Sequence, residues 1–268
     1  MIRELGPGKV ALDFGPTQMN IQVSGADASS AVASEAAVYA SRLVSELAEF
    51  KRLAARPQQE ILTVDGLPDV LQRMIEAVRI SGDADLTPMA AVAGTLSDMT
   101  ADWLFARGIA KVIVNNGGDI AIRLSGAERA VIGIAPALGA MPSHVLEIGA
   151  ADGIGGVTTS GSGGRSFTKG IATAATVLAK TASIADACAT SIGNATFSAH
   201  PAIRLVRAEM IDPLTDLVGH AQRECRHGSI ERHGRGTLRK SYVEGVADDH
   251  RDRELAHREN QHRSDGDQ

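Results

Sequence analysis

The sequence predicts an α+β fold with mixed or antiparallel sheets and packed helices. Runs of short strands, marked by alternating apolar residues, follow runs of helices, marked by apolar residues three and four positions apart. This grouping differs from the regular strand–helix alternation of a parallel βαβ protein. The chain has 268 residues, 44% of them hydrophobic, which suffices for one large core.

A hairpin and a long helix are expected first. Apolar residues alternate over 10–14 and again over 19–23, and a Gly-Pro-Thr-Gln segment separates the two runs. This pattern is typical of a β-hairpin. Asp27 or Ser29 is then placed to cap an alanine-rich helix, which is expected to run to about Arg56.

Two more helices and a second hairpin follow. Residues 67–78 present one continuous apolar face, and the helical period returns over 88–107. The apolar runs at 112–114 and 120–122 flank an Asn-Gly-Gly segment, which tolerates the positive φ angles of a tight hairpin turn. The remaining expected elements are strands near 129–134, 143–149 and 174–179 and a helix over about 184–192.

The chain divides by composition into an α+β domain, residues 1–218, and a charged tail, residues 219–268. The tail holds ten Lys or Arg, ten Asp or Glu and six of the eight histidines, with few large apolar residues. Such a segment buries too little surface to offset its ordering entropy, so we expect it to be disordered. Its histidines leave a metal-binding tract as an alternative.

Composition also limits the classes of partner. The net charge is −5 and aromatic residues make up 3% of the chain, so neither a basic surface nor a set of stacking aromatics indicates nucleic acid as a partner. No apolar run is long enough to span a membrane, and the N-terminus lacks the pattern of a signal peptide. We therefore expect a cytoplasmic protein, with a homodimer among the open oligomeric states.

The glycine-rich segment 158–166 is the first candidate for ligand binding. Its glycines allow backbone amides to converge on an anion, and its hydroxyl and guanidinium groups add hydrogen bonds. A flexible linking loop is the alternative, because Gly and Ser suit that role as well. The expected anion-binding residues are Thr159, Ser160, Gly161, Ser162 and Arg165.

The helix that follows carries the second candidate. Asp186 and Thr190 are spaced i, i+4, so their oxygens face one side and can share a hard cation such as Mg²⁺. The alternative is structural, because Ser183 and Asp186 also fit a capping box at the start of that helix.

The third candidate is the turn at 115–119. Asn116, Gly117 and Gly118 are expected to contact the ligand, although a hairpin turn by itself explains these residues equally well. Asp119, or alternatively Asp98, is the expected general base.

Four segments in this order resemble the ApbE family, the FAD:protein FMN transferases, and most closely its smaller ApbE-like branch. The matched motifs are A-K-G-Y-A-x-D, D-x-G-G-(E/N/D), (T/S)-S-G and A-D-A-x-A-T. In this chain they read Val92-Ala-Gly-Thr-Leu-Ser-Asp98, Asn115-Asn-Gly-Gly-Asp119, Thr159-Ser-Gly161 and Ala185-Asp-Ala-Cys-Ala-Thr190. The resemblance implies the ApbE-like fold and a Mg²⁺ ion held by Asp186 and Thr190.

The resemblance also bears on the reaction. Ala93 and Thr95 stand where the transferases have a lysine and an aromatic residue, so FAD is left open as a cofactor. We expect an enzyme that binds an anionic small molecule, nucleotide-like or a carboxylate, for Mg²⁺-assisted transfer or hydrolysis. The alternatives are an FAD:protein FMN transferase and a non-catalytic binding or scaffold protein on the same fold.

Overall fold

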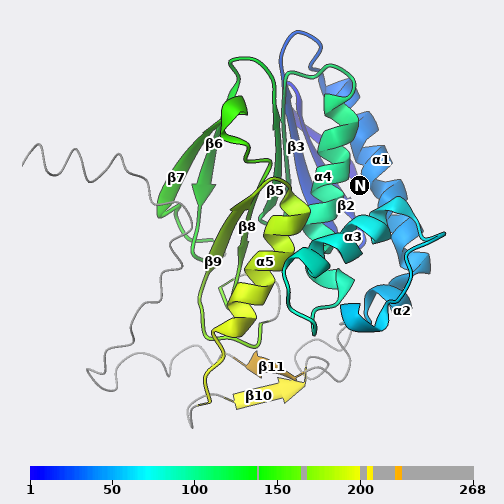
Figure 1. Ribbon diagram of the computed structural model, residues 1–268. Helices are drawn as coiled ribbons and strands as arrows, with labels where there is room; N and C mark the ends of the chain where they lie inside the picture. Colours follow the sequence, from blue (N-terminus) through cyan, green and yellow to red (C-terminus); the bar gives the residue numbers. More distant parts are fainter. Residues whose placement is uncertain (138, 164–167, 200–203, 208–220, 225–268) are drawn as a thin grey trace, which may run out of the picture. The chain divides into compact units, whose positions relative to one another are not determined.

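The computed structural model describes residues 1–137, 139–163, 168–199, 204–207 and 221–224. Within them, seven antiparallel strands form one sheet in the order β1-β2-β3-β4-β5-β8-β9 (Figure 1). Its strands are β1 Ile2–Gly6, β2 Lys9–Phe14, β3 Thr17–Ser24, β4 Lys111–Asn116, β5 Asp119–Leu124, β8 Gly156–Ser160 and β9 Ala175–Ala179. The predicted α+β class with antiparallel sheets and packed helices is confirmed.

The helices pack on one face of this sheet (Figure 1). They are α1 Ser30–Glu49, α2 Lys51–Ala54, α3 Asp69–Ile80, α4 Val92–Phe105 and α5 Ala182–Ala195, with short 3₁₀ helices at Gln58–Glu60, Pro88–Ala91 and Ala150–Asp152. No helix within the described residues has the length and apolar character that a membrane span requires.

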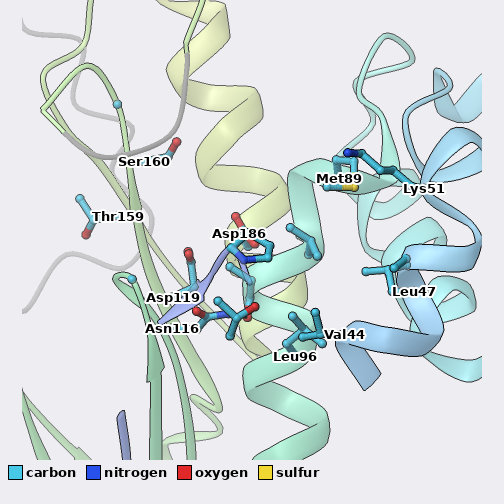
Figure 2. Close-up of a pocket in the computed structure, with 17 residues that line it drawn as sticks. Val44, Leu47, Lys51, Met89, Leu96, Asn116, Asp119, Thr159, Ser160 and Asp186 are labelled. Atoms are coloured by element: carbon cyan, nitrogen blue, oxygen red, sulfur yellow. The ribbon is translucent and has the colours of Figure 1, made fainter. Parts of the chain in front are cut away.

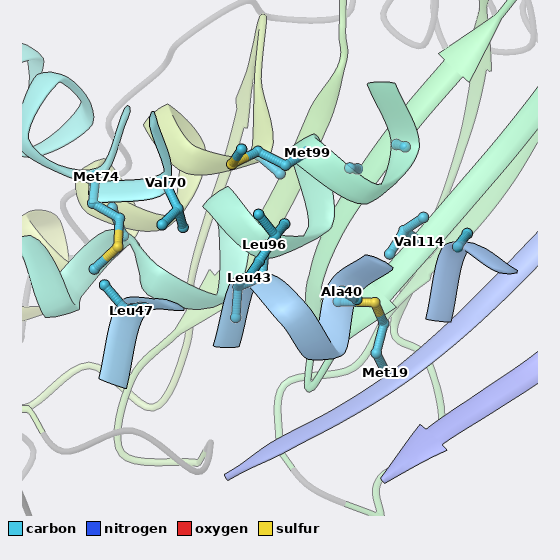
Figure 3. Packing of buried hydrophobic residues seen from close by; sticks show 14 of the residues in the cluster. Met19, Ala40, Leu43, Leu47, Val70, Met74, Leu96, Met99 and Val114 are labelled. Carbon is cyan, nitrogen blue, oxygen red and sulfur yellow. The ribbon is translucent and has the colours of Figure 1, made fainter. Parts of the chain in front are cut away.

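The apolar side chains of the sheet divide between its two faces. Met19 and Val114 belong to the cluster that packs against Leu43 and Leu96 of the helices (Figure 3). On the other face, Ile120, Ile122 and Val157 pack against a separate hairpin, β6 Arg129–Ile134 and β7 His144–Gly149. The alternation of side chains along each strand therefore separates a helix-facing core from a hairpin-facing core.

Most of the predicted elements are confirmed, but the structure differs from the prediction in several places. The N-terminal strand β1 was not foreseen, and Thr158 to Ser160, expected in a loop, form the end of β8. The long helix is capped by Ser29, whose Oγ accepts from the Val32 amide at 3.2 Å, and it ends at Glu49 instead of near Arg56. At Phe50 the backbone leaves the helical region (φ −104°, ψ 10°) and the side chain packs against the core; α2 begins at the next residue, Lys51, and runs to Ala54.

The C-terminal region lies mostly outside the described residues. The chain divides into one unit over residues 1–226 and another over 227–268, and the second contains no described residue. Strands β10 Arg204–Arg207 and β11 Ala221–Glu224 form a short antiparallel pair. The proposed boundary at 218 and the disorder of the charged tail stay predictions.

Helices α4 and α5 approach each other closely at their N-terminal ends, and each caps the other. The Gly94 amide, in the first turn of α4, donates to Asp186 Oδ2 at 2.9 Å. The Ala182 and Ser183 amides, in the first turn of α5, donate to the two oxygens of Asp98 at 3.0 and 2.8 Å. First-turn amides have no partner within their own helix, so this exchange satisfies groups that would otherwise be buried unpaired.

Gly94 is expected to be intolerant of a side chain. A Cβ at this position would lie 2.3 Å from the Ala182 carbonyl oxygen and 2.8 Å from Asp186 Cβ. Gly94→Ala should lower the free energy of unfolding by about 3 kcal/mol, because the helices must separate to admit the methyl group. Urea unfolding followed by circular dichroism measures this loss.

Gly193 provides the matched control on α5. A Cβ there would meet only Thr168 Oγ1 at 3.5 Å, an ordinary contact. Gly193→Ala should therefore be neutral or stabilising by up to about 1 kcal/mol, as expected from helix propensity. Equal losses in the two variants would contradict the proposed tight approach of α4 to α5.

Candidate functional site

A cavity of about 390 Å³ lies between the sheet and the helices (Figure 2). Its residues come from the β2–β3 turn, the end of α1, the start of α4, the β4–β5 turn, the end of β8 and α5. They are Pro16, Thr17, Val44, Leu47, Ala48, Lys51, Met89, Val92, Ala93, Leu96, Asn116, Gly117, Asp119, Thr159, Ser160, Gly161 and Asp186.

Sheet register directs two of the polar side chains toward the helices. Asn116 on β4 pairs with Asp119 on β5, and Asn116 also pairs with Met19, which lies in the helix-facing core. Directly paired residues share one face of a sheet, so Asn116 and Asp119 project toward α4 and α5. The Ser97 hydroxyl of α4 donates to the Asp119 carbonyl oxygen at 2.8 Å and holds this turn against the helix.

The β4–β5 turn is built for close approach. Gly117 and Gly118 occupy its two positions with φ of 72° and 118°, a region that favours glycine. The Asn115 side chain accepts from the Gly118 amide at 2.9 Å and fixes the turn. Gly117 lines the cavity and Gly118 does not.

Asp119 and Asp186 line the same cavity and are the groups with the clearest electrostatic signature. Burial raises the pKa of Asp119 to about 7, and the nearby Thr158 hydroxyl partly opposes this shift. The pKa of Asp186, which is 8% exposed, lies well above its ordinary value because of burial and the nearby negative charge of Asp119. Two neighbouring carboxyl groups with raised pKa values are a common property of catalytic and cation-binding sites.

Thr158 and Ser160 of β8 project to the same side of the sheet as Asp119. Thr158 pairs with Asp119 across the strands and is 1% exposed. Within the described part of the chain its hydroxyl has no hydrogen-bond partner. Ser160 lies on the same face and lines the cavity. The Thr159 hydroxyl is 2.9 Å from that of Thr176 on β9, on the opposite face of the strand, so Thr159 borders the cavity without aiming its hydroxyl into it (Figure 2).

The start of α5 differs from the expected capping box. Thr181 is the N-cap and accepts from the Ile184 amide at 3.3 Å, whereas Ser183 lies inside the helix. The Ser183–Asp186 capping box is therefore wrong. Asp186 does cap a helix, but that helix is α4, through the Gly94 amide.

The structure brings only some of the predicted site residues together. Asn116, Gly117, Asp119, Thr159, Ser160, Gly161 and Asp186 line the cavity. Gly118, Ser162, Thr190 and Asp98 are not among its lining residues. Arg165 lies outside the described residues.

Asp98, the alternative general base, has a different role. It is 1% exposed and accepts hydrogen bonds from Arg123 and from the first-turn amides of Ala182 and Ser183. Because both oxygens are engaged by Arg123 and by the start of α5, Asp98 positions α5. Of the two candidates, Asp119 lines the cavity and Asp98 does not.

Sequence reasoning missed the wall of the cavity opposite the acids. Val44, Leu47 and Lys51 come from the end of α1 and the start of α2, and Met89 precedes α4 (Figure 2). In the sequence, Val44 and Leu47 are indistinguishable from the core face of an amphipathic helix. Their spacing carries no signal that separates a cavity wall from a packed core.

The residues around Asp119 and Asp186 are suited to a hard divalent cation. Oxygen ligands are what Mg²⁺ prefers, and it commonly uses one or two carboxylates and retains water or substrate oxygens. Within the described residues, no cluster of three or more His, Cys, Asp and Glu side chains is arranged to hold a metal. A cation held by two carboxylates alone would keep coordination positions for water or a ligand.

Comparisons with known proteins agree with the features of the sequence. A family model described as AbpE bacteria matches residues 3–226. The chain is 37% identical to a UPF0280 protein of Archaeoglobus fulgidus over 126 residues, which is 47% of this chain and 50% of that protein.

Two further relatives carry the same name. A UPF0280 protein of Methanothrix thermoacetophila is 38% identical over 135 residues, 50% of this chain and 55% of that protein. One of Methanocella arvoryzae is 41% identical over 128 residues, 47% of this chain and 50% of that protein. The chain thus matches about half the length of these curated relatives.

Proposed function

The chain belongs to the AbpE bacteria family, and from the cavity we propose that it is an enzyme acting on a small anionic molecule with the help of Mg²⁺. The reaction class is transfer or hydrolysis. One observation carries this proposal: Asp119 and Asp186 line one cavity with raised pKa values. A divalent cation relieves the repulsion between such carboxylates and attracts an anion to them.

In this proposal, Asp119 and Asp186 hold the cation. Asp186 keeps its orientation because the Gly94 amide donates to its Oδ2. Asp119 is the second ligand in preference to Thr190, because Thr190 does not line the cavity. When bound, Mg²⁺ supplies Lewis-acid polarisation and a template for the anion.

The other residues would bind and orient the anion. Ser160 at the end of β8 and Gly161 after it line the cavity, and they would supply a hydroxyl and a backbone amide as neutral donors. Lys51 lies on the wall opposite and adds positive charge to the cavity. Together these groups favour an anionic ligand over a neutral or cationic one.

The test is Mg²⁺-dependent stabilisation by anions. Wild-type protein should show a higher melting temperature with Mg²⁺ plus ADP or inorganic phosphate than with either component alone. Asp186→Asn should abolish this increase, while its side-chain oxygen can still accept from Gly94 and preserve the fold. Differential scanning fluorimetry with and without EDTA measures the effect.

Two variants identify the second residue that holds the cation, and two further readouts distinguish the alternative functions. Asp119→Asn should lose the Mg²⁺ effect and Thr190→Val should retain it; the reverse result would contradict the role of Asp119. An FAD:protein FMN transferase would instead be stabilised by FAD in a Mg²⁺-dependent way. A non-catalytic binder would show stabilisation insensitive to EDTA and no turnover.

A further inference from the structure

The wall of the cavity opposite the acids is apolar and incompletely covered. Val44 of α1, Met89 before α4 and Val92 of α4 are only partly buried, and all three line the cavity. Leu47 and Leu96, which are buried, also line the cavity (Figure 2). Apolar side chains converging on one cavity gain stability when a ligand covers them.

The cavity therefore has two chemically different sides. Figure 2 shows Asn116, Asp119 and Asp186 on one side, and Val44, Leu47 and Leu96 on the other. A ligand that satisfies both sides carries a polar, anionic group at one end and an apolar body at the other. Inorganic anions and short polar metabolites leave the apolar wall in contact with water.

The volume of the cavity limits the size of that body. At about 390 Å³ the cavity lies near the small end of the range for ligand sites, which is roughly 300–1,000 Å³. One ring or a short branched chain with its charged group fills such a space. A dinucleotide would extend beyond the described walls.

We propose that the ligand is a small amphipathic organic acid, with an aromatic or aliphatic body lying on the wall formed by Val44, Leu47, Met89, Val92 and Leu96. This inference rests on the proposed function, which supplies the anionic group of the ligand. It adds that the rest of the ligand is apolar. Its acid group lies toward Asp119, Asp186 and their cation. Lys51 increases the affinity for every anion, whereas the wall selects the apolar body.

The experiment is isothermal titration calorimetry of the full chain with acetate, butyrate, hexanoate and benzoate, in Mg²⁺ and in EDTA. Affinity in Mg²⁺ should rise about threefold to fourfold for each methylene group that the wall covers. Benzoate should bind more tightly than acetate, and FAD should bind more weakly than hexanoate.

Matched variants assign the effect to the wall. Val44→Asn should weaken hexanoate binding about tenfold and leave acetate binding unchanged. The milder Val44→Ala should weaken hexanoate binding about threefold, which keeps the test informative if the asparagine variant folds poorly. Val38→Asn is the control, because Val38 lies on the same helix, is 42% exposed and does not line the cavity.

A second pair of variants tests how the anionic group of the ligand is bound. Lys51→Gln should weaken all four acids by a similar factor, and Arg52→Gln, its neighbour outside the cavity lining, should change none of them. Affinity independent of chain length, equal effects of Val44→Asn and Val38→Asn, or FAD binding more tightly than every organic acid would each overturn the inference.

The outcomes for the ligand class and for the metal are separable. A chain-length dependence that persists unchanged in EDTA supports the amphipathic ligand and refutes the role of Mg²⁺. Mg²⁺-dependent binding of inorganic phosphate or ADP without any binding of the organic acids refutes the amphipathic ligand and leaves the proposed function in place.

Discussion

Asp98→Asn is expected to lower the free energy of unfolding by about 3 kcal/mol, because it removes a buried charge that both pairs with Arg123 and caps α5. Asp98 is 1% exposed, and Arg123 Nη2 donates to its Oδ1 at 3.0 Å. Its oxygens also accept from the Ala182 and Ser183 amides. An asparagine would turn an amide NH₂ toward one of these donors, leaving it without an acceptor. Urea denaturation measures the loss.

Asp102→Asn is the matched control for Asp98→Asn. Asp102 pairs with Arg123 and Arg73, but its side chain is 39% exposed and that of Arg73 is 47% exposed. Exposed pairs contribute little, so this variant should cost less than about 1 kcal/mol. A loss of the same size in both variants would show that Arg123, and not the capping of α5, determines the result.

We expect the effect of Asp119→Asn on the free energy of unfolding to depend on pH. In the metal-free protein, the change caused by the substitution should be about 2 kcal/mol more stabilising at pH 8 than at pH 5. Burial raises the folded-state pKa of Asp119 to about 7, above the usual value of 3.8. The folded protein therefore holds this proton more tightly than the unfolded chain. The resulting stability is fully present below pH 3.8 and is lost as the pH rises through 7.

The exposure of the Asp119 side chain limits the size of this pH-dependent change in stability. A shift from 3.8 to about 7 corresponds to at most about 4 kcal/mol, and contact of the partly exposed Asp119 with the cavity reduces it. The measurement is urea unfolding of wild type and variant in EDTA at pH 5 and pH 8. Identical differences at the two pH values would mean that Asp119 is ionised in the folded protein throughout this range.

Asp102 again supplies the control, with the opposite sign. Burial alone would raise its pKa, but hydrogen bonds and charges from Arg73 and Arg123 bring the pKa below its usual value. Its contribution to stability is therefore present at neutral pH and is lost as the pH falls through that lowered pKa. The loss of unfolding free energy caused by Asp102→Asn should thus be largest at pH 5 and above. Unlike the effect of Asp119→Asn, it should not change between pH 5 and pH 8.

The elements that the sequence predicts well are those governed by local chemistry. The two-residue turn at Gly117 and Gly118 follows from their tolerance of positive φ, and α3 follows from one apolar face. The break after Glu49 could not be predicted, because neither Gly nor Pro marks it: Phe50 leaves the helical region while its side chain packs against the core, and α2 begins at Lys51.

The candidate site shows the same division. Asp119 and Asp186, 67 positions apart, both stood out as chemistry-bearing residues in the sequence, and the cavity brings them together. The partners of Asp186 could not be assigned, because the Gly94 amide that it accepts from belongs to another helix. Its spacing to Ser183 matched a capping box that the real start of α5, at Thr181, excludes.

By itself the sequence determined the α+β class, most of the strands and helices, and the polar residues worth testing, because hydrophobic period, turn residues and short motifs act over a few neighbouring positions. Only the tertiary structure decided that Asp98 holds α5 while Asp119 faces the cavity, and that Val44 and Met89 form its apolar wall. These assignments depend on which helices and strands meet in space, and spacing along a single chain carries no information about that.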